Sequence, residues 1–205
     1  MTNIGVLASG RGSNFQSIID SAEEGYLDKV DIKILISDNG NSRALERAEK
    51  HGIDNIYIDP GDFDDDRGFE EEMISVLEER DINLVVMAGF MRILSPYFIR
   101  HYRNRVMNIH PSLLPSFQGL HPHRQALEYG VKVSGCTVHF ANEGVDSGPI
   151  ILQKAVPVKD DDTEDSLAAR VLEEEHKIYP EAIKLYSEER LKIEGRRVKI
   201  NILEG

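Results

Sequence analysis

The sequence predicts an α/β protein with a mostly parallel, twisted sheet that is flanked by helices. In the first half of the chain, short apolar runs rich in β-branched residues alternate with amphipathic stretches. This βαβαβαβ order is typical of a parallel sheet with helices on both faces. The length of 205 residues suits one domain, and the sequence contains no repeat, low-complexity tract or linker. We therefore expect a single domain over residues 1–205.

The first half of the chain supplies most of the predicted parallel sheet. Strands are expected at residues 4–7, 32–36, 55–58 and 84–88. The last of these runs is apolar at every position, which is typical of a strand buried on both faces. Helices are expected between the strands, at residues 15–24, 43–51 and 67–80.

After Leu94 the alternation becomes less regular, and we expect an antiparallel portion of the sheet in this C-terminal half. Predicted strands lie at residues 105–109, 135–140 and 150–158, and two short ones lie within 191–202. Predicted helices lie at residues 95–102, 125–129 and about 164–177, with a shorter helix from Pro180. Thr163 is the expected N-cap of the long helix.

The composition excludes several classes of protein. With 40% hydrophobic and 29% charged residues, the chain is a compact globule rather than a disordered or collagenous protein. The 24 Lys and Arg residues against 36 Asp and Glu give a net charge of −12, so neither nucleic acid nor an anionic membrane is an expected partner. The single cysteine, Cys136, excludes an internal disulfide and a cysteine-built metal site. The sequence has no targeting or membrane-spanning pattern, and we expect a cytoplasmic protein.

A glycine-containing turn follows the first predicted strand. Residues 8–14 (ASGRGSN) lead into the first helix, and Ser13 or Asn14 is expected to cap it. Backbone N–H groups at a helix N-terminus favour an anion, so we interpret the turn as a site for a phosphate monoester. The turn has no lysine, which excludes a Walker A loop. Phe15 replaces the third glycine of the dinucleotide fingerprint, although Asp38 after the second strand would suit a ribose.

Two polar side chains mark the end of the fifth predicted strand. Asn108 and His110 project to one face because side chains alternate along a strand. Open α/β sheets bind ligands at the carboxyl ends of their strands. An amide beside an imidazole is suited to stabilise an oxyanion, with proton transfer from the ring. The alternative is structural: His110 caps the strand, and Asn108 binds the loop backbone.

Other histidines and one aspartate also have both structural and functional interpretations. We expect His139 to be a hydrogen-bonded core residue. His121 and His123 suggest a metal site, but the sequence supplies no third ligand at a suitable spacing. Asp146, in a glycine-flanked loop, either forms an ordinary turn or orients His110.

A carboxylate also interrupts the apolar stripe of the long predicted helix. Leu167, Val171 and Glu175 follow one another at a spacing of four residues, so they lie along one face. A buried carboxylate at this position would be paired or would hold a polar ligand. The alternative is a glutamate in water at the end of the helix.

Six segments carry a more specific pattern. They are residues 9–14 (SGRGSN), 88–94 (AGFMRIL), 108–115 (NIHPSLLP), 119–126 (GLHPHRQA), 144–149 (GVDSGP) and 175–180 (EHKIYP). In this order, and over nearly the whole chain, they resemble the phosphoribosylglycinamide formyltransferase family of purine biosynthesis. Gln118 departs from the family pattern, which usually has proline at this position.

The resemblance implies a Rossmann-like formyltransferase fold, with a phosphate-binding βα half at residues 1–105 and a catalytic and folate-binding half at 106–205. It implies an enzyme that transfers a formyl group from 10-formyltetrahydrofolate to the amino group of glycinamide ribonucleotide. These two small molecules are the expected partners, and the reaction needs no metal. The chain is expected to be a monomer or a homodimer.

The resemblance also implies roles for individual residues. Asn108 and His110 would stabilise the oxyanion, His110 would donate a proton, and Asp146 would keep the imidazole protonated and relay a proton to the leaving folate nitrogen. The implied ribonucleotide-binding residues are Gly12, Ser13, Asn14 and Glu175. The implied folate-binding residues are Arg67, Met91, Arg92, Ile93, Leu94, Asn108, Ala141, Asn142, Glu143, Gly144, Val145 and Asp146.

Three other functions stay open. A formyltetrahydrofolate hydrolase would use the same histidine and aspartate with water as the nucleophile, but the phosphate-binding turn and the absence of an N-terminal regulatory domain argue against it. A transfer-RNA formyltransferase would need a basic C-terminal extension, which the net charge of −12 does not suggest. A non-catalytic nucleotide-binding module would use residues 9–14 and Asp38, and it would bind NAD without turnover.

The substitution Asn108→Ala should lower turnover by about a hundredfold or more, because it removes one donor to the oxyanion. The measurement is the steady-state rate of formyl transfer at saturating substrate. A variant that retains full turnover would remove Asn108 from the mechanism.

Overall fold

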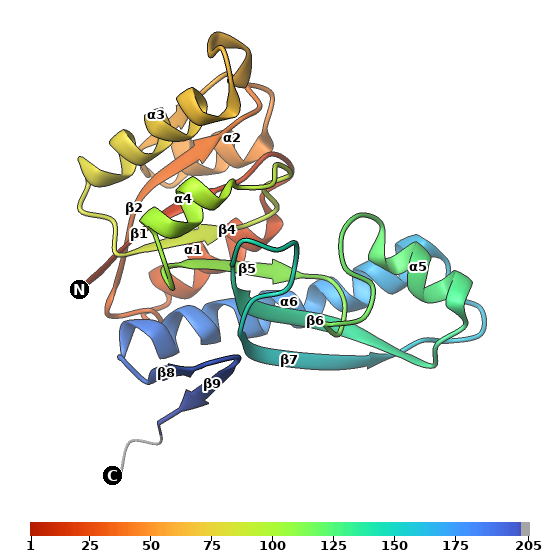
Figure 1. Ribbon diagram of the computed structural model, residues 1–205. Coiled ribbons are helices and arrows are strands. Elements are labelled where there is room, and N and C mark those ends of the chain that lie inside the picture. Colours follow the sequence, from red (N-terminus) through yellow and green to blue (C-terminus); the bar gives the residue numbers. More distant parts are fainter. Residues whose placement is uncertain (202–205) are drawn as a thin grey trace. The chain divides into compact units, whose positions relative to one another are not determined.

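A computed structural model describes residues 1–201 and divides into two compact units, Met1–Asn108 and Ile109–Gly205 (Figure 1). Ile202, at the end of the last predicted strand, lies outside the described residues. Among the residues that are described, no helix combines the length and the apolar character needed to cross a membrane.

The first unit is built on a parallel sheet. Its strands are β1 (Thr2–Leu7), β2 (Val30–Ser37), β3 (Asn55–Tyr57), β4 (Leu84–Met87) and the start of β5 (Val106–His110), in the order β3-β2-β1-β4-β5. Each neighbouring pair in this order is parallel. Every residue of β4 is buried, which confirms the prediction of a strand covered on both faces.

Helices connect the strands of the first unit. They are α1 (Ser13–Glu23), α2 (Arg43–Lys50), the short 3-10 helix η1 (Pro60–Asp62), α3 (Asp66–Glu78) and α4 (Pro96–His101). Each helix predicted from the sequence in this region is present. The apolar stripes of the three longer helices are buried, with Phe15 and Ile18 on α1, Ala44 and Ala48 on α2, and Met73 and Leu77 on α3 fully excluded from solvent.

The second unit contains the expected antiparallel portion. β6 (Val133–Phe140) and β7 (Ile150–Pro157) form an antiparallel pair. β9 (Arg197–Ile200) pairs with β7 in parallel and with β8 (Leu191–Glu194) in antiparallel orientation. α5 (Pro122–Tyr129) precedes β6, and the long helix α6 (Glu164–Ser187) packs against β6 and β7 (Figure 1).

α6 is one continuous helix, so the prediction of a separate helix from Pro180 is wrong. A proline inside a helix removes a hydrogen bond and costs about 3 kcal/mol or more. The apolar residues around it, Ile178, Tyr179, Ala182 and Ile183, are all buried. Burial of a large apolar side chain contributes about 1.5–3 kcal/mol, so packing on this face outweighs the local cost of the proline.

The N-terminus of α6 is fixed by reciprocal hydrogen bonds between two side chains and the backbone. The hydroxyl of Thr163 accepts from the N–H of Ser166 (3.2 Å), and the hydroxyl of Ser166 accepts from the N–H of Thr163 (2.9 Å). This capping box confirms Thr163 as the N-cap.

The substitution Thr163→Ala should lower the free energy of unfolding by about 1 kcal/mol, because the N–H of Ser166 loses its acceptor. Thr163→Ser keeps the hydroxyl and serves as the matched control, so its loss should be much smaller. Urea denaturation followed by circular dichroism measures both. Equal losses in the two variants would contradict a capping role for the hydroxyl.

Candidate active site

The turn after β1 leads directly into α1. Gly12 is the N-cap of α1 and has a left-handed backbone, with φ of 66° and no hydrogen bond from a capping side chain. The prediction that Ser13 or Asn14 caps the helix is wrong, because both lie inside it as its first two residues. The first N–H groups of a helix have no acceptor within the helix, so they are available to an anion.

The N-terminal part of α2 holds this turn in place. The hydroxyl of Ser42 donates to the carbonyl of Gly10 (2.9 Å), and Nε of Arg47 donates to the carbonyl of Arg11 (2.9 Å). A Cβ on Gly12 would lie 2.8 Å from the Cβ of Ala44. Only glycine therefore fits at position 12, where both the close approach and the positive φ exclude a side chain. The carbonyls of Gly10 and Arg11 are thus bound by α2 and its N-cap residue.

Ser9 connects the turn to the segment that follows β4. Its N–H donates to the carbonyl of Gly89 (3.1 Å), and its hydroxyl accepts from the N–H of Met91 (2.8 Å). At the other end of the segment, the buried carboxylate of Glu70 accepts from the N–H of Ser95 (2.6 Å) and from its hydroxyl. Both ends of this segment are therefore fixed within the first unit.

The apolar residues of this segment differ in exposure. Met91 and Ile93 are 67% and 76% exposed, whereas Leu94 is buried. Large apolar side chains exposed on a fixed segment are typical of a surface that receives an apolar ligand. Met91 and Ile93 are therefore accessible to a ligand, whereas the side chain of Leu94 is not.

The two arginines expected to contact folate already have partners in the first unit. Arg92 forms an ion pair with Asp66. Arg67 pairs with Glu71 (2.8 Å) and lies over the ring of Tyr97, 4.0 Å from its centroid. The hydrogen bond to Glu71 raises the pKa of Arg67. A ligand that used either arginine would have to share or replace these contacts.

His110 and Asp146 come together in the second unit. Nδ1 of His110 lies 3.3 Å from Oδ2 of Asp146, and their side chains are 7% and 12% exposed. Nε2 of His110 lies 2.9 Å from the carbonyl of Phe117 and donates to it, since a carbonyl oxygen can only accept. Asn108 is two residues before His110 on β5, so the two side chains extend from the same side of the strand.

The loop that carries Asp146 is bound by neighbouring segments. The carboxylate of Asp146 also accepts from the N–H of Gly119 (2.9 Å), and the carbonyl of Asp146 accepts from the side chain of Gln118 (2.9 Å). Within the loop, the side-chain oxygen of Asn142 accepts from the hydroxyl of Ser147 (2.8 Å). Of the other loop residues expected to bind folate, Ala141 is half-buried, and Glu143, Gly144 and Val145 are exposed.

His139 is a buried histidine of β6, as the sequence predicts. It is 2% exposed, and Nδ1 lies 3.0 Å from the carbonyl of Phe140 and donates to it. Nε2 lies 3.7 Å from Oδ1 of Asp146, a contact that the sequence did not predict. Burial lowers the pKa of His139, so the neutral ring is favoured beside this carboxylate.

The sequence analysis missed two residues that hold the loop after His110. The hydroxyl of Thr137 on β6 accepts from the N–H of Leu114 (3.0 Å) and donates to the carbonyl of Ser112 (2.7 Å). The side chain of Gln153 on β7 donates to the carbonyl of Leu114 and to Thr137, each at 2.9 Å. The sequence could have indicated Thr137, because it is a polar residue in a buried strand. Nothing in the sequence distinguished Gln153.

Glu175 lies on the buried face of α6. It is 6% exposed, so the alternative of a glutamate in water does not apply. Burial, followed by the charge of Glu175, raises the pKa of the Cys136 thiol on β6 to about 12. The carboxylate therefore lies close enough to β6 to influence a side chain of this strand.

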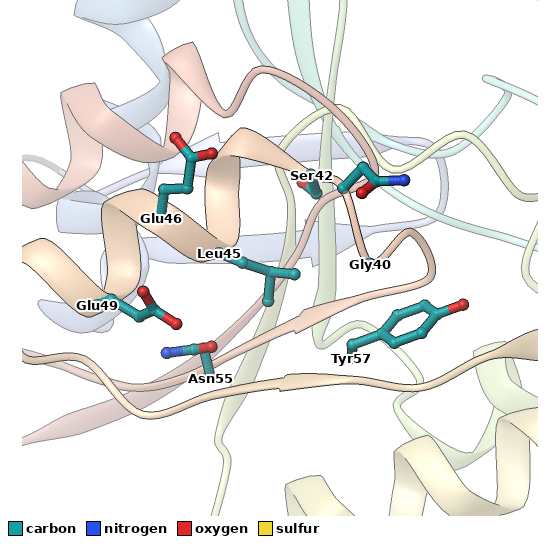
Figure 2. Close-up of a pocket in the computed structure, with 8 residues that line it drawn as sticks. Gly40, Ser42, Leu45, Glu46, Glu49, Asn55 and Tyr57 are labelled. Atoms are coloured by element: carbon teal, nitrogen blue, oxygen red, sulfur yellow. The ribbon is translucent and has the colours of Figure 1, made fainter.

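A pocket of about 410 Å3 lies in the first unit beside α2 and β3 (Figure 2). Its lining residues are Gly40, Asn41, Ser42, Leu45, Glu46, Glu49, Asn55 and Tyr57. None of the predicted site residues lines it. In the described part of the chain, no three His, Cys, Asp or Glu residues are arranged to hold a metal ion.

Comparisons with known proteins agree with the fold. The family model described as "Formyl transferase" matches residues 2–183. A phosphoribosylglycinamide formyltransferase of Escherichia coli (strain K12) is 45% identical over 191 residues, which are 93% of this chain and 90% of that protein. The trifunctional purine biosynthetic protein adenosine-3 of Homo sapiens is 48% identical over 89% of this chain, which spans 18% of that protein. The crystal structure of glycinamide ribonucleotide transformylase 1 from Symbiobacterium toebii has a TM-score of 0.95 at 50% identity and covers 98% of this chain and 94% of that one.

These similarities extend over the parallel and antiparallel strands and over the loops that carry His110 and Asp146. The chain belongs to the formyl transferase family, with the Rossmann-like fold that the resemblance implied. It is an enzyme of the group-transferring class. The relatives that it matches over nearly their whole length bear the name phosphoribosylglycinamide formyltransferase.

The lowered pKa of His139 predicts a pH dependence of stability. The unfolded chain protonates this residue near the ordinary value of 6.5, before the folded chain does. The free energy of unfolding should therefore fall as the pH drops from about 6.5 toward the lowered pKa, and it should be insensitive to this group above 6.5.

Nuclear magnetic resonance of the His139 ring gives its titration directly, and urea denaturation at several pH values gives the stability. His139→Gln should flatten the slope below pH 6.5. A His139 ring that titrates at or above its ordinary value would contradict the prediction.

Proposed function

We propose that this chain transfers a formyl group from 10-formyltetrahydrofolate to the amino group of glycinamide ribonucleotide, in de novo purine biosynthesis. The products are formylglycinamide ribonucleotide and tetrahydrofolate. The observation that carries the proposal is the buried pair of His110 and Asp146, 3.3 Å apart, in a member of the formyl transferase family. 10-Formyltetrahydrofolate acts as a co-substrate.

Asn108 and His110 stabilise the charge that develops during transfer. Attack of the amine on the formyl carbon places negative charge on the formyl oxygen, where fixed hydrogen-bond donors have their largest effect. The amide of Asn108 and the ring of His110 extend from the same side of β5 and supply two such donors. His110 is also the proton donor, and a proton that it gives to this oxygen returns to the ring when the intermediate collapses and the bond from the formyl carbon to the folate nitrogen breaks. Two donors and a proton relay suffice for the reaction, so it needs no metal.

Asp146 orients the ring of His110. The carboxylate faces Nδ1, and Nε2 donates to the carbonyl of Phe117 in this structure. A protonated ring can donate from both nitrogens at once, whereas a neutral ring cannot. During the reaction, the formyl oxygen takes the place of the Phe117 carbonyl at Nε2. Asp146 then relays a proton, directly or through water, from the attacking amine to the leaving folate nitrogen.

The turn at the start of α1 binds the phosphate of the ribonucleotide. Gly12, Ser13 and Asn14 present N–H groups at a helix N-terminus, where the helix dipole also favours an anion. This local site allows an acidic protein with a net charge of −12 to bind a phosphorylated substrate. Glu175 contacts the same substrate and is suited to accept hydrogen bonds from its polar groups.

The folate binds against two segments. The first segment supplies Met91, Arg92, Ile93 and Leu94, and Arg67 of α3 is a further contact. The second segment is the loop of residues 141–146. The exposed apolar side chains of Met91 and Ile93 cover the aromatic head of the folate, and the fixed backbone of their segment supplies hydrogen bonds.

The enzyme acts in the cytoplasm as a monomer or a homodimer. Its net charge of −12 disfavours association with nucleic acid and with anionic membranes. Its partners are therefore the two small-molecule substrates.

The function predicts that loss of the formyl group from 10-formyltetrahydrofolate depends on the ribonucleotide. The measurement follows the absorbance of the folate with and without glycinamide ribonucleotide, and NAD titration serves as a parallel binding control. Loss of formyl only with the ribonucleotide supports the transferase. Loss without it would instead indicate a hydrolase, and NAD binding without any turnover would indicate a nucleotide-binding module.

A further inference from the structure

The backbone at Asp146 has an unusual conformation. Its φ is 46°, in the left-handed region that residues with a side chain rarely adopt. Aspartate is one of the few non-glycine residues that adopt this conformation, and neighbouring contacts help to hold it. The direction of the Asp146 side chain follows from this backbone, so whatever holds the backbone also holds the carboxylate toward His110.

Two side chains from other segments bind consecutive carbonyls at this point. Nε2 of Gln118 donates to the carbonyl of Asp146 (2.9 Å), and Nη2 of Arg196 donates to the carbonyl of Ser147 (3.1 Å). Gln118 lies in the loop before α5, and Arg196 lies in the turn between β8 and β9. The two peptide groups that follow the left-handed residue are therefore each held by a side-chain donor.

Two other contacts close the base of the loop. The N–H of Phe140 donates to the carbonyl of Pro149 (2.9 Å). Gly148 packs against the carbonyl of Phe140 so closely that a Cβ would overlap it. The N–H of Gly119 binds the Asp146 carboxylate (2.9 Å), whereas Gln118 and Arg196 bind the backbone carbonyls beside it.

We propose that Gln118 and Arg196 are positioning residues that fix the backbone of Asp146 and thereby direct its carboxylate at His110. The proposal rests on the proposed catalytic role of Asp146. Through the hydrogen bond of Arg196 to Ser147, the C-terminal hairpin contributes to the position of the loop, although it lies beyond residues 2–183 that the family model matches. Charged donors such as guanidinium form the stronger hydrogen bonds, which suits Arg196 to this task.

The first test uses Gln118→Met and Arg196→Met, which keep much of the side-chain length and remove the donors. Each should lower kcat about tenfold, and the double variant about a hundredfold, because small displacements of a catalytic group carry costs of this size. KM for the ribonucleotide should stay unchanged. Arg197→Met, an exposed neighbour on β9, is the matched control, and Arg196→Lys should restore part of the rate.

A double-mutant cycle with Asp146→Asn separates positioning from a general structural effect. If Gln118 and Arg196 act through Asp146, their loss should cause no further fall of kcat in the Asp146→Asn background. A similar fall in both backgrounds would overturn the proposal. If Asp146→Asn itself keeps full turnover, the proposed role of Asp146 fails instead.

Amide hydrogen exchange of residues 141–149 tests the positioning independently of turnover. Exchange in this loop should accelerate about tenfold in the double variant, while exchange in the strands of the first unit should not change. Unchanged exchange in the loop would overturn the proposal even if kcat fell. This measurement also identifies a variant that has lost its fold, because all segments would then exchange rapidly.

Discussion

Burial of both faces of β1 and β4 confines polar side chains to the ends of these two strands. All of β4 and the last four residues of β1 are buried, and a charged group along such a strand would lose its water without gaining a partner. The polar groups lie where the strands end. The turn of residues 8–14 follows β1, the segment of residues 88–95 follows β4, and His110 is the last residue of β5. Ser9 connects the turn after β1 to the segment after β4 by hydrogen bonds with Gly89 and Met91. The core and the site therefore depend on the same constraint.

The helices and strands were predictable because the spacing of apolar residues along the sequence matches the period of a helix or a strand. The apolar run at β4 and the N-cap of α6 at Thr163 depend on residues close together in the chain, and both predictions were confirmed. The two errors, at Pro180 and at the start of α1, have one physical cause. In each case packing between elements overrides a local preference. The buried residues around Pro180 keep α6 continuous, and Ala44 of α2 leaves no space for a side chain at position 12.

The candidate site was predictable only in part. The sequence singled out His110 and Asp146, because each is a polar group at a turn-rich strand end, and the structure places them 3.3 Å apart. No feature of the sequence indicated the contact of His139 with Asp146 or the hydrogen bonds of Gln153. They depend on the pairing of β6 with β7, whose register shifts between Val138 and His139. A sequence pattern does not specify such a shift.

The environment of Cys136 has a practical consequence. This residue is the only cysteine of the chain, it is fully buried, and its thiol has a pKa of about 12. The thiolate is the form that reacts with alkylating reagents and oxidants, so both the burial and the raised pKa disfavour reaction of Cys136 at neutral pH. A second cysteine introduced at an exposed position such as Val145 would then react in preference to Cys136. The natural sequence therefore suits fluorescence or spin-label studies of the loop.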